Sequence, residues 1–370
     1  MSSQDSKGNK LSNMRVLVTG ACGTVGKELI RQLLKNSEFN PSEVLGIDNN
    51  ESEIFFLDQD YLDDSRANFF LGDLRDKDTL IKISKGVDII FHAAALKHVV
   101  LCERSPFEAV QTNILGVQNV ISAASENEVE KVIFTSSDKA VNPTNVMGTS
   151  KLMGERLITA ANSSSYSSRA PIFASTRFGN VLGSNGSVIP IFRKQIQDGG
   201  PVTLTDEDMT RFVMTVEQSA RLVLESASLA KGGEVFITKM PVIKISTLAE
   251  AMIEELAEGF GYKAEDIQVE VIGAKPGEKL YEELMSDEET RRSVELDNYF
   301  SVLPAFRGMY SDINYNYANL KSDKVTNPYN SAKEKCLSKA ELKSFLLDNN
   351  LLGSKPEDLK SQRYWPGDKN

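Results

Sequence analysis

The stretch MRVLVTGACGTVGKELIRQLLKN, residues 14–36, decides the fold. A short run of aliphatic and β-branched residues ends at Gly20, and apolar residues then recur at helical spacing over 27–36. This order predicts a strand, a tight turn and a helix. Gly20, Gly23 and Gly26 permit the bend, the close approach of backbone N–H groups to a phosphate, and close packing of the helix.

The alternation of short apolar runs with helical patterns continues to about residue 180. Further strands are predicted at 43–48, 69–73, 87–95, 131–137 and 171–180, and helices at 106–127 and 148–162. Strands separated by helices imply right-handed crossovers and a parallel sheet covered on both faces. The expected fold class is therefore α/β, a Rossmann-like doubly wound parallel sheet.

An acidic residue marks the predicted cofactor site. Asp48 closes the second strand, where a carboxylate accepts hydrogen bonds from the ribose hydroxyls of NAD and repels the 2′-phosphate of NADP. The sequence thus favours NAD over NADP, although Asp48 can also be read as a turn residue before Asn49 and Asn50. Asp73 is expected near the adenine, and three alanines form a flat wall or simply pack. The predicted cofactor-binding residues are Gly20, Gly23, Thr24, Val25, Gly26, Asp48, Asp73, Leu74, Ala93, Ala94, Ala95 and Lys151.

After residue 180 the alternation loosens. Helices are predicted at 188–197, 216–230, 245–261 and 338–349, and short strands at 200–205, 210–215, 234–239 and 267–273. We expect a disordered tail at 1–13, an NAD-binding domain at 14–180, and a smaller C-terminal substrate-binding lobe at 181–310 that also contributes some sheet-completing segments. A C-terminal extension occupies 311–370.

Composition excludes several classes of function. The net charge of −10 and the pI near 5.0 argue against broad nucleic-acid or anionic-membrane binding. The polar start has no apolar core, and no apolar run reaches the roughly 20 residues of a spanning helix, so a cytoplasmic location is predicted. Three widely spaced cysteines suit reduced thiols, and two histidines make a histidine-based metal site improbable, so no metal is predicted.

The candidate catalytic stretch is SSDKAVNPTNVMGTSK, residues 136–151. It begins where the strand at 131–137 ends, the edge of an open α/β sheet where ligands bind. Ser137, Asp138 and Lys139 are consecutive there, while Met147 and Lys151 fall one helical turn apart on the next helix. Met147 cannot transfer protons. The alternative is an ordinary exposed ion pair in a turn.

Five ordered motifs carry a resemblance to a known family. They are FHAAALKHV (91–99), SSDKAVNPTNVMGTSK (136–151), RFGNVLGSNGSVIPIF (177–192), DMTRFVMT (208–215) and GEKLYEEL (277–284). Together the motifs resemble the extended short-chain dehydrogenase/reductases, and within them the UDP-N-acetylglucosamine 4,6-dehydratases of polysaccharide biosynthesis. Met stands here in place of the active-site Tyr of many relatives.

The resemblance implies roles for these residues. Asp138 protonates the departing C6 hydroxyl, Lys139 removes the C5 proton, and Lys151 holds the nicotinamide ribose. With Met147 in the tyrosine position, Ser137, Asp138 or a water molecule takes the proton of the 4-hydroxyl. The residues implied for the UDP-sugar are Lys97, Asn180, Ser187, Val188, Ile189, Arg193, Arg211 and Glu278.

The predicted activity is NAD-dependent dehydration of UDP-N-acetylglucosamine to a 4-keto-6-deoxy sugar nucleotide, with C5 retention favoured. The alternatives are a C5-inverting 4,6-dehydratase, a UDP-sugar 4-epimerase, or a non-catalytic NAD-binding scaffold. The missing Tyr speaks against an epimerase, and the presence of Asp138, Lys139 and Lys151 speaks against a scaffold. Homo-oligomers are common in the family, and one is expected here.

Overall fold

The computed structural model describes residues 11–163, 170–184, 187–273, 277–306, 308 and 313–353. The chain divides into two compact units that interleave along the sequence. Unit 1 comprises Met1–Phe178, Glu217–Thr238 and Asp287–Asn327; unit 2 comprises Gly179–Val216, Lys239–Ser286 and Pro328–Asn370. Two segments beyond residue 180 thus return to unit 1.

Unit 1 is built on one sheet, which has ten strands among the described residues. Its strands are β1 (Arg15–Thr19), β2 (Glu43–Asp48), β3 (Ala67–Leu71), β4 (Ile89–His92), β5 (Lys131–Ser137), β6 (Ile172–Phe178), β10 (Val235–Thr238), β14 (Ser293–Leu296), β15 (Tyr299–Val302) and β16 (Leu320–Ser322).

The sheet has the topology that the sequence predicts. The order is β16-β14-β15-β10-β6-β5-β4-β1-β2-β3, and every pair from β3 to β10 is parallel. The chain reverses direction across the sheet between β1 and β4, the switch point beside which doubly wound folds bind ligands. The expected α/β class is confirmed. The antiparallel strands β14, β15 and β16 were not predicted.

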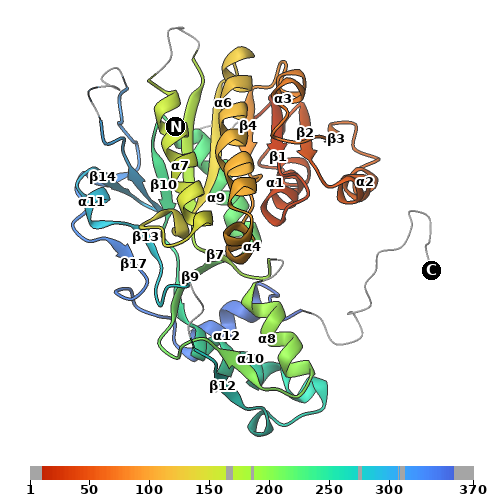
Figure 1. Cartoon of the computed structure of the whole chain (residues 1–370), viewed down its shortest axis with the longest axis vertical. Coiled ribbons are helices and arrows are strands. Elements are labelled where there is room, and N and C mark those ends of the chain that lie inside the picture. The colour runs from red at the N-terminus through yellow and green to blue at the C-terminus, as the bar shows by residue number, and fades with distance from the viewer. Residues whose placement is uncertain are drawn as a thin grey trace, which may run out of the picture. The chain divides into compact units, whose positions relative to one another are not determined.

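Helices cover both faces of this sheet, as the parallel strand order requires. They are α1 (Thr24–Lys35), α2 (Glu51–Asp60), α3 (Lys77–Ile83), α4 (Val99–Arg104), α5 (Pro106–Val110), α6 (Gly116–Glu126), α7 (Val146–Ala161), α9 (Val216–Leu229) and α11 (Asp287–Thr290). Figure 1 shows α6 and α7 beside one another over one face, and their apolar side chains close a core with Val132, Phe134 and Phe173 of the strands.

Two corrections to the predicted elements follow from local hydrogen bonds. Helix α2 was not predicted; the Asn50 side chain accepts the Glu53 N–H and caps it. The predicted strand at 87–95 is too long, because β4 ends at His92. Beyond that residue the pairing on the β1 side ends, because β1 stops at Thr19 and its chain turns at Gly20, although β5 continues on the other side.

Among its described residues, unit 2 combines short sheets with three α-helices. Its elements are β7 (Asn180–Val181), α8 (Val188–Gln197), β8 (Val202–Leu204), β9 (Thr210–Met214), β11 (Val242–Lys244), α10 (Ile245–Leu256), β12 (Val269–Val271), β13 (Glu283–Met285), β17 (Tyr329–Asn330) and α12 (Lys339–Asp348).

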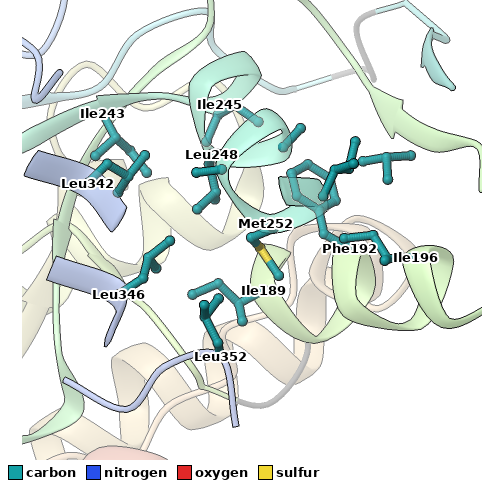
Figure 2. Packing of buried hydrophobic residues seen from close by; sticks show 14 of the residues in the cluster. Ile189, Phe192, Ile196, Ile243, Ile245, Leu248, Met252, Leu342, Leu346 and Leu352 are labelled. Carbon is teal, nitrogen blue, oxygen red and sulfur yellow. The ribbon is translucent and has the colours of Figure 1, made fainter. Parts of the chain in front are cut away.

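The core of unit 2 lies among its three helices. Figure 2 shows Ile189 and Phe192 of α8, Met252 of α10, and Leu342 and Leu346 of α12 pointing toward one another. Each of these side chains is buried. The sequence predicts all three helices because their apolar residues recur at helical spacing.

No helix in the part of the chain that the structure describes is long and apolar enough to cross a membrane. Cys22, Cys102 and Cys336 are free thiols, and burial raises the pKa of each.

Candidate active site

The glycine-rich turn between β1 and α1 has the geometry that binding of a phosphate needs. Gly20 has a φ of +69°, and a Cβ there would lie 2.7 Å from backbone atoms of Ala94. A Cβ on Gly26 would lie 2.0 Å from the carbonyl oxygen of Gly20. Gly23 precedes the helix and supplies no side-chain cap. The turn is therefore tight, and the N-terminus of α1 stays open to an anion.

Asp48 at the end of β2 is held beside this turn. Its Oδ2 accepts the Cys22 N–H at 3.0 Å, and its Oδ1 accepts the Asn50 N–H at 3.0 Å. Thr24 and Val25 form the first residues of α1. The structure thus brings together the predicted phosphate turn and the predicted ribose acceptor.

The other predicted adenosine contacts lie after β3. The guanidinium of Arg75 donates to both carboxylate oxygens of Asp73, with Nη2 to Oδ2 at 2.6 Å, and this pairing lowers the pKa of Asp73. Leu74 is buried, and its carbonyl accepts a hydrogen bond from Asn119 at 2.8 Å. Asp73 therefore already has a cationic partner on the same loop.

Three alanines follow β4, and the first two are held by Thr19 of β1. The Ala93 N–H donates to the Thr19 carbonyl at 3.1 Å, and the Ala94 N–H reaches the Thr19 Oγ1 at 3.4 Å. Together with Ala95 they are partly exposed, as a wall beside a flat ligand requires. His92 is buried in the sheet: its Nδ1 hydrogen-bonds the Thr19 Oγ1 at 2.6 Å, and burial lowers its pKa to about 3.

Ser137, Asp138 and Lys139 form one hydrogen-bonded group at the end of β5. The Lys139 Nζ lies 3.2 Å from both carboxylate oxygens of Asp138. The Ser137 hydroxyl donates to the Asp138 Oδ1, and the Lys139 N–H donates to the same oxygen at 3.0 Å. Asp138 is 1% exposed, whereas the Lys139 side chain is 28% exposed. An acid and an amine are therefore in contact, with the amine open to solvent.

Met147 lies in an apolar cluster. It is buried against Cys102 and Ala109, with Val99 and Val146 at the margin. The side chain that replaces the usual tyrosine therefore packs against α4 and α5 and offers no proton-transferring group.

Lys151 is buried one turn further along α7. Its Nζ donates to the Thr135 carbonyl of β5 at 2.7 Å and lies 4.4 Å from the centre of the Phe134 ring. Burial lowers the pKa of Lys151 to about 8, and the carboxylate of Glu155 opposes that shift. An ammonium group has three N–H donors, and Thr135 accepts one of them.

A glycine sets the distance between α7 and the Asp138 turn. A Cβ on Gly148 would lie 2.2 Å from the Lys139 carbonyl oxygen. The same helix end is fixed by Asn145, which accepts the Gly148 N–H at 2.8 Å, and by Glu103, which accepts the Val146 N–H at 2.6 Å. Gly148 escaped the sequence analysis because a single glycine in a helical pattern gives no signal of what it contacts.

Asn113 is a second residue that the sequence analysis missed. It lies in a π-helical turn, Gln111–Leu115, inside the predicted helix at 106–127. Its side chain exchanges two hydrogen bonds with the backbone of Leu96 and donates to the Ser150 hydroxyl at 2.9 Å. The Leu96 contact fixes the segment that carries the exposed Lys97. No clear signal in the sequence pointed to it, because Asn113 is one of several amide residues in that predicted helix.

The predicted substrate residues beyond residue 178 belong to unit 2. Arg211 is buried, and its guanidinium donates to the carbonyl oxygens of Thr210, Lys279 and Leu280 at 2.8–3.2 Å. The carboxylates of Glu282 and Glu278 lie at 3.4 and 3.8 Å. Arg211, which the resemblance implies for the UDP-sugar, thus holds the 278–282 segment in place.

The remaining predicted substrate residues lie around the start of α8 and on β7. Asn180 donates to the Phe212 carbonyl at 3.3 Å, and Arg193 lies over the Phe260 ring at 5.6 Å. Ile189 is buried in the core of unit 2, so only its backbone can contact a ligand. Ser187 precedes α8 and Val188 begins it, both partly exposed.

Sheet topology, glycine turn and ordered motifs together place the chain among the extended short-chain dehydrogenase/reductases. Within that class it belongs to the family described as polysaccharide biosynthesis protein, which matches residues 16–304.

The relatives carry different names. A Methanocaldococcus jannaschii protein named an uncharacterized membrane protein is 48% identical, over 91% of this chain and 96% of its own length. A Campylobacter jejuni UDP-N-acetylglucosamine 4,6-dehydratase (inverting) is 36% identical over 86% of this chain and 92% of its own length. A Rickettsia akari UDP-glucose 4-epimerase is 37% identical over 90% of this chain and 95% of its own length. Sequence similarity alone therefore does not separate dehydratase from epimerase.

Solved structures confirm the fold. The X-ray structure of Pen from Bacillus thuringiensis is 41% identical, with a TM-score of 0.84 over 92% of this chain and 99% of that one. DesIV, a dTDP-glucose 4,6-dehydratase from Streptomyces venezuelae with NAD bound, has a TM-score of 0.61 at 23% identity, over 72% and 87% of the two chains. The second likeness concerns the fold alone.

Proposed function

We propose that this protein is an NAD-dependent UDP-N-acetylglucosamine 4,6-dehydratase of polysaccharide biosynthesis, with C5 retention favoured. One observation carries the proposal: the contact between the buried Asp138 carboxyl and the partly exposed Lys139 amine. Elimination of water from a hexose needs an acid for the leaving hydroxyl and a base for the neighbouring C–H, close together.

The residues of the first turn fit a dinucleotide. The Gly20 and Gly26 positions admit no Cβ, and α1 begins without a side-chain cap. Asp48, beside this turn, can accept hydrogen bonds from ribose hydroxyls. An acid at Asp48 favours NAD over NADP. Lys151, with donors beyond the one given to Thr135, would bind the nicotinamide ribose. When bound, NAD supplies reversible hydride transfer, which makes the sugar C4 a ketone and so acidifies the C5 proton.

The protein's own groups then perform the elimination. In the ion pair Lys139 carries the proton, and its transfer to Asp138 within the 3.2 Å contact yields a neutral acid and a neutral amine. Lys139 in that form takes the C5 proton, and Asp138 donates its proton to the C6 hydroxyl, which leaves as water. Lys139 then returns a proton to C5. Ser137, which donates to Asp138, Asp138 itself or a water molecule is proposed to take the proton of the 4-hydroxyl, which replaces the proton that left the pair in the water.

The substrate contacts stay predictions. Arg211 is proposed for the diphosphate and Glu278 for the uridine ribose. Lys97, Asn180, Arg193 and the 187–189 segment are also proposed to contact the UDP-sugar. An anion reaching Arg211 would compete with two carboxylates, Glu278 and Glu282. The domain boundaries, the homo-oligomer and the cytoplasmic location also stay predictions.

A UDP-sugar 4-epimerase is the second candidate, because relatives of similar identity carry that name. Incubation with UDP-N-acetylglucosamine separates the two by mass spectrometry. A product lighter by one water supports the dehydratase, and a product of equal mass contradicts it. Lys139→Ala is expected to abolish turnover and keep NAD binding, measured by calorimetry. Turnover at the wild-type rate would refute the role of Lys139, and absence of any turnover in the wild type would favour a non-catalytic scaffold.

A further inference from the structure

A fully buried cluster of charges lies on β6, α7 and α11 of unit 1. Arg177 donates from Nε and Nη2 to the two oxygens of Glu155, at 3.0 and 2.7 Å. Its Nη1 and Nη2 also donate to Glu289, both at 3.1 Å. The three side chains are 1%, 3% and 7% exposed. Arg292 also contacts Glu289, with its Nη2 3.7 Å from Oε1, and pairs with the exposed Glu288 at 3.3 Å. Three carboxylates and two guanidinium groups give the cluster a net charge of −1.

Lys151 lies one helical turn before Glu155 on α7, a spacing that puts both side chains on one face of the helix. Its ammonium is buried and donates to a backbone carbonyl, which carries no charge. The surplus negative charge of the cluster therefore matches the positive charge of Lys151. A buried charge without such a counter-charge would be costly, and the group would lose its proton instead.

The other titratable groups around Lys151 do not supply this counter-charge. His92 on β4 is neutral, because burial lowers its pKa to about 3. Asp138 at the end of β5 is in contact with Lys139, which offsets its charge. Arg177 on β6 is positive and engaged with the two glutamates. Glu155 is the carboxylate on Lys151's own helix face.

We propose that Glu155 is a positioning residue for Lys151: anchored by Arg177, its carboxylate keeps the buried ammonium charged and so able to donate to a ligand. That the ligand is the nicotinamide ribose rests on the proposed function. The charge state of Lys151 does not, and it can be measured on the protein alone. The pKa of Lys151 agrees with this role of Glu155: burial lowers it, the Glu155 carboxylate opposes that shift, and the pKa falls only to about 8.

The test is a titration of Lys151 by NMR in protein labelled with ¹³C at the lysine Cε. The Lys151 signal is assigned by its absence from the spectrum of Lys151→Met. In wild type the midpoint is expected near 8. Glu155→Gln keeps an oxygen that can accept from the Arg177 Nε but removes the charge, so the midpoint should fall by at least one pH unit, as expected for loss of a nearby opposite charge.

Glu289→Gln is the matched control. It removes the same charge from the same guanidinium, but from α11 instead of the Lys151 helix face, so the midpoint should move by less than half as much. Equal shifts in the two variants, or no shift in Glu155→Gln, would overturn the proposal. If Glu155→Gln does not fold, the wild-type titration decides: a midpoint below about 7 shows that Glu155 does not keep the ammonium charged. None of these outcomes depends on which reaction the protein catalyses.

Discussion

Replacing Gly148 with Ala tests how the structure positions the proposed base. The added Cβ would lie 2.2 Å from the Lys139 carbonyl oxygen, and real Cβ contacts shorter than 3.0 Å essentially do not occur. Either α7 or the Asp138–Lys139 turn must therefore move by about 1 Å, because the obstructing atom belongs to the backbone. Such overpacking costs about 1–3 kcal/mol, partly offset by the better helix propensity of Ala, about 1 kcal/mol.

The effect on catalysis should exceed the effect on stability. A displacement of about 1 Å at a reacting group lowers rates by about 100-fold, which corresponds to about 3 kcal/mol of barrier. We expect kcat/KM with UDP-N-acetylglucosamine to fall by about that factor, while the free energy of unfolding in urea falls by no more than about 2 kcal/mol. Initial rates and urea denaturation on the same preparation measure both quantities.

Gly233→Ala is the control for destabilisation alone. Gly233 has a φ of +84°, and a Cβ there would lie 2.8 Å from Pro304 Cγ, so this variant is also strained. The Gly233 carbonyl accepts a hydrogen bond from Thr159 of α7. Thr159 lies 11 residues beyond Gly148, about 16 Å along the helix, so this strain is far from the Asp138–Lys139 turn. Turnover should stay within about three-fold of wild type. Wild-type kcat/KM in Gly148→Ala, at any loss of stability, would refute the reasoning.

Three further predictions address single residues. Met147→Leu keeps the volume of the buried cluster, so stability should change by less than about 1.5 kcal/mol and turnover should be retained; loss of turnover in rate assays would show a chemical role for the thioether. Asp48→Ser should weaken NAD binding and reduce the preference for NAD over NADP, measured by calorimetry. An unchanged ratio of the two dissociation constants would contradict the assignment of Asp48 to the ribose. His92 has a folded pKa near 3, below its usual 6.5, so the unfolded chain binds more protons between these values and stability falls as pH falls from 6.5 to 3. Urea denaturation over that range should show that His92→Asn loses about 1–4 kcal/mol less free energy of unfolding than wild type. An equal dependence of the unfolding free energy on pH in the two proteins would contradict this role of His92.

Most strands of the parallel sheet were predictable because they are short buried apolar runs, whereas the edge strand β3 is apolar but partly exposed. The bounds of β2 and β5 agree with the sequence to the residue. Helices α2 and α3 were not predicted. Helix α3 is about half as long as a typical helix, and α2 begins in DNNES, a segment that also favours a turn. The antiparallel β14 and β15 form a hairpin across Asp297 and Asn298, a local signal that the sequence analysis missed. The pairing of β15 with β10, by contrast, joins segments far apart in sequence, so no local pattern encodes it.

For the site, the sequence identified residue types but not their partners. It predicted that Asp138 and Lys139 lie at a strand end, since position follows from the strand pattern. It did not anticipate that Arg211 is occupied by carbonyl oxygens and two carboxylates, nor that Arg177 joins Glu155 to Glu289. Those contacts form between segments up to 112 residues apart, which only the folded chain brings together.

The most direct test of the central claim uses UDP-N-acetylglucosamine carrying deuterium at C4, followed by NMR of the product. If Asp138 and Lys139 drive elimination as proposed, the deuterium is recovered in a C6 methyl group, C4 is a ketone, and the product is lighter by one water. Deuterium retained at C4 of a sugar with an intact C6 hydroxyl would contradict the dehydratase and identify an epimerase.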